Sequence, residues 1–217
     1  MLTTPTEILS TFPGERTGKQ HQVFRDAVQA YAETLGYPCQ TENKWLLIGN
    51  SSEADYIICA GDEDSSVMTI LEILRILPEN RRSRAAFVLF ESPFWNMLSY
   101  ARKHPETRKQ LVFYLEQVGS GDRIRFFPTK QLLENQRDLT SLYKACGYFG
   151  KKNLLVQEKN VIPWYIPFPS AVSVCCMAND RKERYRNRIK SSSSVDITNI
   201  NILCAALVSY ICCEQPK

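Results

Sequence analysis

Apolar residues recur at helical spacing in three long stretches of the chain. Between residues 19 and 35 they fall three or four positions apart, and Gly36 then supplies a residue that readily ends a helix. A second stretch, residues 64–77, is apolar around most of its circumference and stops at Pro78. A third covers residues 196–213. Each stretch is predicted to be a helix that buries one face against the rest of the protein.

Two continuous apolar runs of strand length flank the second predicted helix. They are DYIICA at residues 55–60 and RAAFVLFE at residues 84–91, and such runs are typical of strands covered on both faces. Because the order is strand, helix, strand, Tyr56–Ala60 and Ala85–Phe90 are predicted to be central parallel strands of a β-α-β unit. The earlier stretch CQTENKWLLIG indicates a hairpin with Glu42 and Asn43 at its tip.

The rest of the pattern adds further elements of both kinds. They are helices at residues 94–103 and 129–146, strands at 110–118, 123–127 and 171–177, and a basic strand that ends at Lys190. This alternation favours an α/β fold with three layers, α-β-α, around a mixed, mostly parallel central sheet. One domain of 217 residues can bury a sizeable core, so residues 1–217 are predicted to form a single domain.

Composition places the chain among ordinary globular proteins. Hydrophobic residues make up 44% of the sequence and charged residues 23%, and the net charge of +4 is too small to indicate a partner by itself. The first residues lack the basic and apolar regions of a secretory signal, and no apolar run reaches the ~20 residues of a membrane helix. We therefore expect a cytoplasmic monomer without a membrane partner, whose eight cysteines are mostly reduced core thiols.

A series of segments spread over most of the chain carries a family resemblance. The segments are GKQHQVFRDAVQAYAETLGY, ADYIICA, SSVMTILEILRIL, RSRAAFVLFE, QLVFYLEQVGSGD and NINILCAALVSYI. In this order they resemble the co-catalytic zinc aminopeptidase family, whose relatives include glutaminyl cyclases and glutamate carboxypeptidases. The resemblance implies a zinc-exopeptidase-like fold. It also implies two zinc ions held by two histidines and by carboxylates, with a glutamate that takes a proton from the attacking water.

The positions that would hold zinc in this family differ in the present sequence. The strand that would run into a His-x-Asp motif passes from Ala60 straight to Gly61. Asp64 matches the carboxylate that would bridge the two metals, and Glu116 matches an aspartate on a later strand. The resemblance thus implies that Asp64 and Glu116 are remnants of a ligand set, and two carboxylates alone make a poor zinc site.

The catalytic base and the other ligands are replaced as well. Pro93 stands at the position of the base, Phe94 at that of a zinc ligand and Lys190 at that of the second histidine. The two histidines of the chain, His21 and His104, occupy other positions. The resemblance therefore implies an aminopeptidase-type protein, natural or redesigned, that has no catalytic residue, no zinc and no other cofactor. Such a protein would serve as a scaffold or binding module, with a peptide or protein as a conceivable partner.

Two alternative functions remain open on the sequence alone. The first is a zinc-dependent exopeptidase with atypical ligands, for which zinc would be the cofactor. The second is a nucleic-acid-binding protein, because RKERYRNRIK at residues 181–190 would place basic side chains on one face of a strand. A charged edge strand that prevents aggregation explains the same pattern, and this explanation is favoured.

The sequence also predicts roles for two groups of aromatic residues and for one acidic stretch. Trp164, Tyr165 and Phe168 lie among prolines, where they either form a binding surface or pack a loop onto the sheet. Phe94 and Trp95 follow the position of the lost base and are predicted to fill the former cleft. The acids of GDEDSS, residues 61–66, are predicted to cap the following helix rather than to bind metal.

Overall fold

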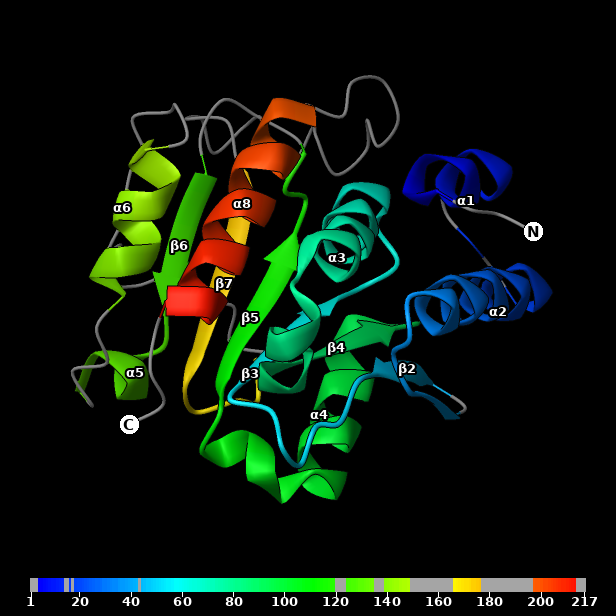
Figure 1. Ribbon diagram of the computed structural model, residues 1–217. Coiled ribbons are helices and arrows are strands. Elements are labelled where there is room, and N and C mark those ends of the chain that lie inside the picture. The colour runs from blue at the N-terminus through cyan, green and yellow to red at the C-terminus, as the bar shows by residue number, and fades with distance from the viewer. Residues whose placement is uncertain are drawn as a thin grey trace, which may run out of the picture.

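The computed structural model describes residues 4–13, 16, 18–42, 44–119, 124–134, 139–148, 166–176 and 197–213. Figure 1 shows the arrangement of its elements. The helices are α1 (Pro5–Thr11), α2 (Lys19–Thr34), α3 (Asp64–Ile76), α4 (Pro93–Lys103), α5 (Lys130–Glu134), α6 (Thr140–Tyr148) and α8 (Ile197–Cys213), with short 3₁₀ segments η1 (Glu79–Arg84) and η2 (Pro105–Arg108). The strands are β1 (Cys39–Glu42), β2 (Trp45–Ile48), β3 (Tyr56–Ala60), β4 (Ala85–Phe90), β5 (Leu111–Glu116), β6 (Ile124–Pro128) and β7 (Ala171–Cys176).

In the part of the chain that the structure describes, the strands form one mixed sheet in the order β1-β2-β4-β3-β5-β7-β6. β3 pairs in parallel with both β4 and β5, and β5 pairs in parallel with β7. The outer pairs β1/β2, β2/β4 and β6/β7 are antiparallel. The predicted central parallel strands, the predicted hairpin and the predicted α/β class are therefore confirmed.

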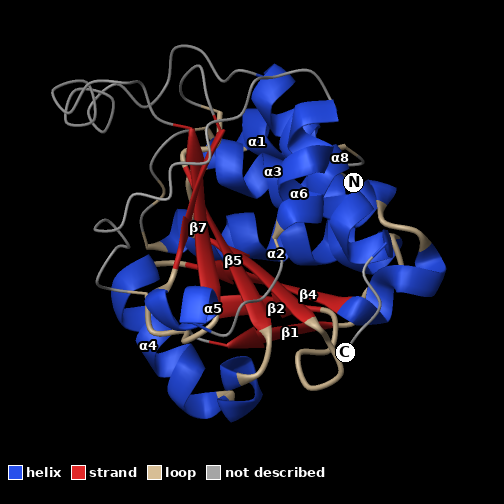
Figure 2. Ribbon diagram, turned by 90° about the vertical axis from the view of Figure 1, so that its left-hand side faces the viewer, coloured by secondary structure: helices blue, strands red, loops and turns tan. Residues whose placement is uncertain are grey.

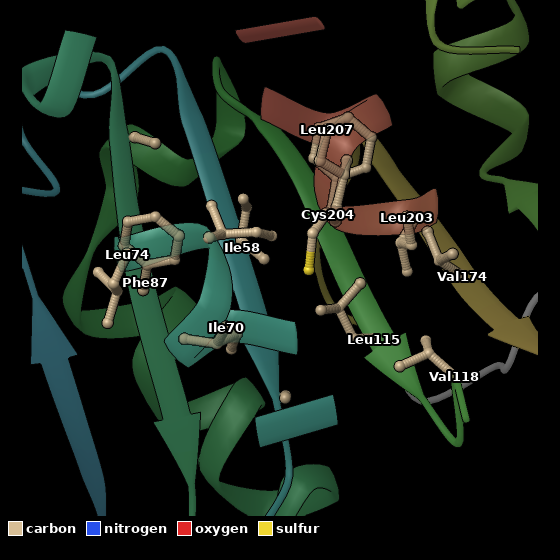
Figure 3. Close-up of a cluster of buried hydrophobic side chains, with 14 of the residues drawn as sticks. Ile58, Ile70, Leu74, Phe87, Leu115, Val118, Val174, Leu203, Cys204 and Leu207 are labelled. Atoms are coloured by element: carbon tan, nitrogen blue, oxygen red, sulfur yellow. The ribbon is translucent and has the colours of Figure 1, made fainter. Parts of the chain in front are cut away.

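Helices cover both faces of this sheet, and alternate strand residues point into two cores. One core joins Ile58 and Phe87 to apolar residues of α1, α2, α3, α6 and α8. Figure 3 shows part of it, with Ile70 and Leu74 of α3 and Leu203 of α8 beside the strands. The second core joins the opposite face of β3 and β4 to α4, which lies across the sheet from α3 in Figure 2. These two layers of helices around one sheet are the predicted α-β-α architecture.

Several element boundaries differ from the sequence-based expectation. Helix α1 was not predicted, although Thr4 and Glu7 form a capping box at its start. The single helix predicted at residues 129–146 is wrong, because α5 ends at Glu134 and Leu139 is not helical. β5 is also shorter than residues 110–118. The predicted basic strand at residues 181–190 lies outside the described residues.

The cysteines and the apolar character of the helices are two features on which the composition led to expectations. The cysteines whose side chains the structure describes are free, and four of them, at positions 59, 146, 175 and 204, are buried. Burial raises the pKa of the Cys146 thiol to about 12, which keeps it protonated and unreactive. Among the described residues, no helix has both the length and the apolar character needed to cross a membrane.

Candidate functional site

Acidic residues gather at the carboxyl ends of the parallel strands. Asp62, Glu63 and Asp64 follow the last residue of β3, Glu91 follows β4, and Glu116 is the last residue of β5. We call residues 61–64 the β3–α3 turn. Because parallel strands end at the same edge of a sheet, these acids share one end of the molecule, where open α/β sheets bind their ligands.

Glu63 serves as the N-cap of helix α3. Its carboxylate accepts hydrogen bonds from the backbone N–H groups of Ser65 at 2.9 Å and Ser66 at 3.0 Å. Both serine hydroxyls donate to the same carboxylate at 2.7 Å. A negative charge at a helix N-terminus is stabilised by the backbone donors and by the helix dipole. The predicted capping role of this acidic stretch is thus confirmed for Glu63.

Asp64, the predicted remnant of a bridging metal ligand, is paired with an arginine. The Nη2 atom of Arg16 lies 2.5 Å from Oδ1 of Asp64, and Nη1 donates to the backbone carbonyl of Asp62 at 2.5 Å. The Arg16 side chain is only 2% exposed, whereas that of Asp64 is 30% exposed. Sequence reasoning missed Arg16, which lies 48 residues before its carboxylate partner.

Asp62 is paired with one of the two histidines. His21 of helix α2 places Nε2 3.0 Å from Oδ2 of Asp62. Burial raises the pKa of the Asp62 carboxyl, and the neighbouring charges of His21 and Arg16 offset only part of this rise. The sequence offered one signal for this placement, since His21 is three and seven positions from Phe24 and Val28 on the buried face of α2.

A small pocket opens beside this pair. It is lined by His21, Phe24, Arg25, Gly61, Asp62, Leu89, Phe90 and Glu91. Its empty volume, including space open to solvent, is about 220 Å³. Sites for small organic ligands typically measure ~300–1,000 Å³. The pocket is therefore too small to bury a peptide substrate.

The segment after β4 carries the positions where the family resemblance places the base and a ligand. Pro93 and Phe94 are the first residues of helix α4, which begins after residues 91 and 92, and their side chains lie outside the described part of the structure. Trp95 is 64% exposed, so the prediction that it fills the former cleft is wrong. The helix turns Asn96, Met97 and Tyr100 inward instead, which places Trp95 on its outer face.

The aromatic surface predicted near residue 165 is only partly described. Phe168 is 2% exposed and belongs to the core between the sheet and α4. It therefore packs a loop onto the sheet and contributes nothing to a binding surface, because its ring is covered. Trp164, Tyr165 and Lys190 lie outside the described residues.

His104 lies far from the acids of the β3–α3 turn. It belongs to a cluster at the opposite end of the sheet, formed by residues that precede β3 and β5. Its ring stacks on Tyr100 with centroids 4.2 Å apart. Nδ1 lies 3.0 Å from Oε1 of Glu106 and 3.4 Å from Oγ of Ser51. A catalytic triad needs the hydroxyl and the carboxylate on opposite ring nitrogens. Here both face Nδ1, so this cluster is a structural network.

The donor groups that the structure describes around the β3–α3 turn do not fit a zinc ion. Zinc in proteins takes three or four His, Cys, Asp or Glu ligands. Among the described residues, no three such side chains come close enough together to hold a metal ion. Asp64 and Glu116 end at the same edge, but Asp64 already faces the guanidinium of Arg16. That cation would repel a second one placed on the same carboxylate.

Of the comparisons with known proteins, the one with solved structures finds proteins of similar architecture. No family model matches the sequence, and no curated protein matches it significantly. Among solved structures, a Zn-dependent exopeptidase from Parabacteroides distasonis is similar with a TM-score of 0.69 at 10% identity, covering 97% of this chain and 96% of that one. A glutaminyl cyclase from Fimbriiglobus ruber has a TM-score of 0.66 at 12% identity, covering 97% and 93%. A glutaminyl cyclase from Porphyromonas gingivalis has a TM-score of 0.65 at 13% identity, covering 95% and 94%. The chain therefore has the fold of the Zn-dependent exopeptidases and glutaminyl cyclases.

Proposed function

We propose that this chain is a non-hydrolytic protein with the zinc-exopeptidase fold, which acts as a scaffold or binding module. The observation that carries the proposal is the pairing of the three acids in the β3–α3 turn. Glu63 caps a helix, Asp64 binds Arg16 and Asp62 binds His21. Each carboxylate of the β3–α3 turn is therefore committed to a protein group.

The residues after β4 support the same proposal. General-base catalysis requires a side chain that accepts a proton within hydrogen-bond reach of the attacking water. Proline has no such atom, and Pro93 stands where the family resemblance places the base. Losing a general base typically lowers a rate by ~10²–10⁴, and losing a metal-bound nucleophile lowers it further.

The pocket beside His21 and Asp62 does not support binding of a small organic ligand at the β3–α3 turn. A volume of about 220 Å³ that includes open solvent accommodates little more than a few waters or a small ion. A partner of this module would instead contact exposed surface. Trp95, more than half exposed on α4, is the kind of residue that anchors protein interfaces.

A direct test combines metal analysis with assays of two activities. Purified protein should contain well below one zinc per chain. It should neither cleave aminoacyl-arylamides nor cyclise peptides with N-terminal glutamine, with or without added zinc. Asp64→Asn is the matched variant, since a contaminating enzyme would be unaffected by it. Chelator-sensitive turnover that is lost in Asp64→Asn would contradict the proposal and favour an exopeptidase with atypical ligands.

A further inference from the structure

Arg16 occupies a site built for its guanidinium group. The residue lies between α1 and α2, and its side chain is almost fully buried. Nη1 donates to the Asp62 carbonyl, while Nη2 donates to the Phe12 carbonyl and to the Asp64 carboxylate, each at 2.5 Å. The guanidinium carbon lies 3.8 Å from the centre of the Phe24 ring. Three acceptors and one aromatic face thus surround a single planar cation.

This set of contacts discriminates between kinds of cation. A guanidinium is planar, presents its donors as a fork and stacks on aromatic rings, whereas an ammonium is a compact point charge. Two carbonyls and a carboxylate spread over two nitrogens match the fork, and the Phe24 ring matches the flat face. A divalent metal would gain nothing from the ring and would have only one carboxylate from this set.

The site also connects segments that are distant in sequence. Phe12 follows α1, Phe24 belongs to α2, and Asp62 and Asp64 belong to the turn between β3 and α3. Phe12 and Phe24 contact each other edge to face, with centroids 5.9 Å apart. Figure 1 shows α1 and α2 lying beside α3 at one end of the molecule. Arg16 therefore joins the two N-terminal helices to the edge of the sheet.

We propose that the β3–α3 turn, with Phe12 and Phe24, forms a guanidinium-selective cation site that Arg16 fills from within the chain. Filling this site docks α1 and α2 onto the sheet. A chain that lacks the Arg16 side chain would then accept free guanidinium in its place. The inference goes beyond the proposed function, although both use the pair of Arg16 and Asp64. It concerns the docking of α1 and α2 and is tested by stability, whereas the proposed function is tested by turnover, so the failure of one can be told from the failure of the other.

The test is chemical rescue of the variant Arg16→Ala. Its melting temperature should fall by on the order of 5 °C, and hydrogen exchange should increase in α1 and the first turns of α2. Millimolar guanidinium chloride should restore both, whereas equimolar sodium chloride or urea should not. Arg75→Ala is the matched control, because Arg75 of α3 also pairs with an acid but is 55% exposed. It should change the melting temperature little and show no rescue.

A second variant covers the case in which Arg16→Ala does not fold. Arg16→Lys keeps the charge and most of the bulk, so a site that needs only a positive charge would leave it as stable as the wild type. The guanidinium-selective site predicts a lower melting temperature for Arg16→Lys. Wild-type stability in either variant would overturn the proposal. So would a larger gain for Arg16→Ala from micromolar zinc than from millimolar guanidinium.

Discussion

Each acid of the β3–α3 turn has its own partner, which explains how adjacent carboxylates are accommodated at one sheet edge. Neighbouring carboxylates repel one another when both are charged. The repulsion from Asp64 contributes to the raised pKa of Asp62. Burial is the larger cause of that rise. The counter-charges of Arg16 and His21, together with the backbone donors around Glu63, offset the repulsion. At the residue scale, each acid of this turn is therefore held by a protein group.

The cluster at the opposite end of the sheet makes a pH-dependent contribution. Burial acts to raise the pKa of Glu106, but hydrogen bonds from the backbone, His104 and Ser51 outweigh it and leave the pKa below its ordinary value of 4.5. A lowered carboxyl pKa stabilises the fold above the unfolded value and loses this effect as the pH falls through the folded value. Glu106→Gln should therefore be less stable than the wild type at pH 7.

The measurement is urea unfolding of both proteins between pH 7 and pH 3. The difference in unfolding free energy should shrink below pH 4.5 and vanish once Glu106 is protonated in the wild type. Glu53→Gln is a suitable control, because Glu53 is an exposed acid of the loop before β3. A difference between Glu106→Gln and the wild type that stays constant with pH would show that the carboxylate charge plays no part.

At the element scale, α8 packs against α3 in the larger of the two cores. Leu207 of α8 is fully buried among residues of α3 and the central strands, in the core drawn in Figure 3. Ile197 on the same helix is 65% exposed. Leu207→Ala should lower the free energy of unfolding by ~2–5 kcal/mol, because a cavity remains in a packed core. Ile197→Ala should change it by less than about 0.5 kcal/mol.

Denaturant unfolding of the two α8 variants measures the loss of unfolding free energy when a large aliphatic residue is replaced by alanine. One replacement is at a buried position of the helix and the other at an exposed position. Both lose aliphatic carbon atoms, and helix propensity favours alanine slightly in each case. Equal losses in the two variants would mean that α8 does not pack as described. A loss confined to Leu207→Ala supports the packing of α8 on α3.

Some elements and contacts could be predicted from the sequence, and others could not. The central strands and α3 were predictable because continuous apolar runs and helical spacing are local signals. Helix α1 was missed because it has only seven residues, too few for a clear period. The pairs Arg16–Asp64 and His21–Asp62 join residues more than 40 positions apart, and no local pattern encodes such contacts. Trp95 was misplaced because a short apolar sequence does not show which side of α4 faces the sheet.

At the scale of the whole molecule, two cores on opposite faces share the strands β3, β4 and β5. Loss of one core would expose strands that the other core needs, so the described elements should unfold together. We also propose that residues 1–217 act as a single domain and as a monomer. Because the cores consist of apolar side chains from the sheet and its helices, the stability of the fold rests on packing.

This leads to a prediction about metal and stability. A ligand that binds only the folded state stabilises it by about 2.7 kcal/mol when present at 100 times its dissociation constant. For a chain of this size, such a gain would raise the melting temperature by roughly 5–10 °C. Because the acids of the β3–α3 turn are already paired with protein groups, zinc should have no such effect. Chelator should likewise leave the melting temperature of freshly purified protein unchanged within about 1 °C.

Differential scanning calorimetry with 1 mM chelator, 0.1 mM zinc or neither would check this, and Arg16→Ala should be scanned beside the wild type. If zinc stabilises the wild type by several degrees, a metal site exists that outcompetes the Arg16 guanidinium for Asp64. If zinc stabilises only Arg16→Ala, the arginine alone excludes metal from an otherwise competent edge. We expect neither result, because the removal of Arg16 still leaves Glu63 engaged by the start of α3 and Asp62 by His21. With Glu63 and Asp62 committed to protein groups, the β3–α3 turn does not provide the three or four ligands that zinc requires.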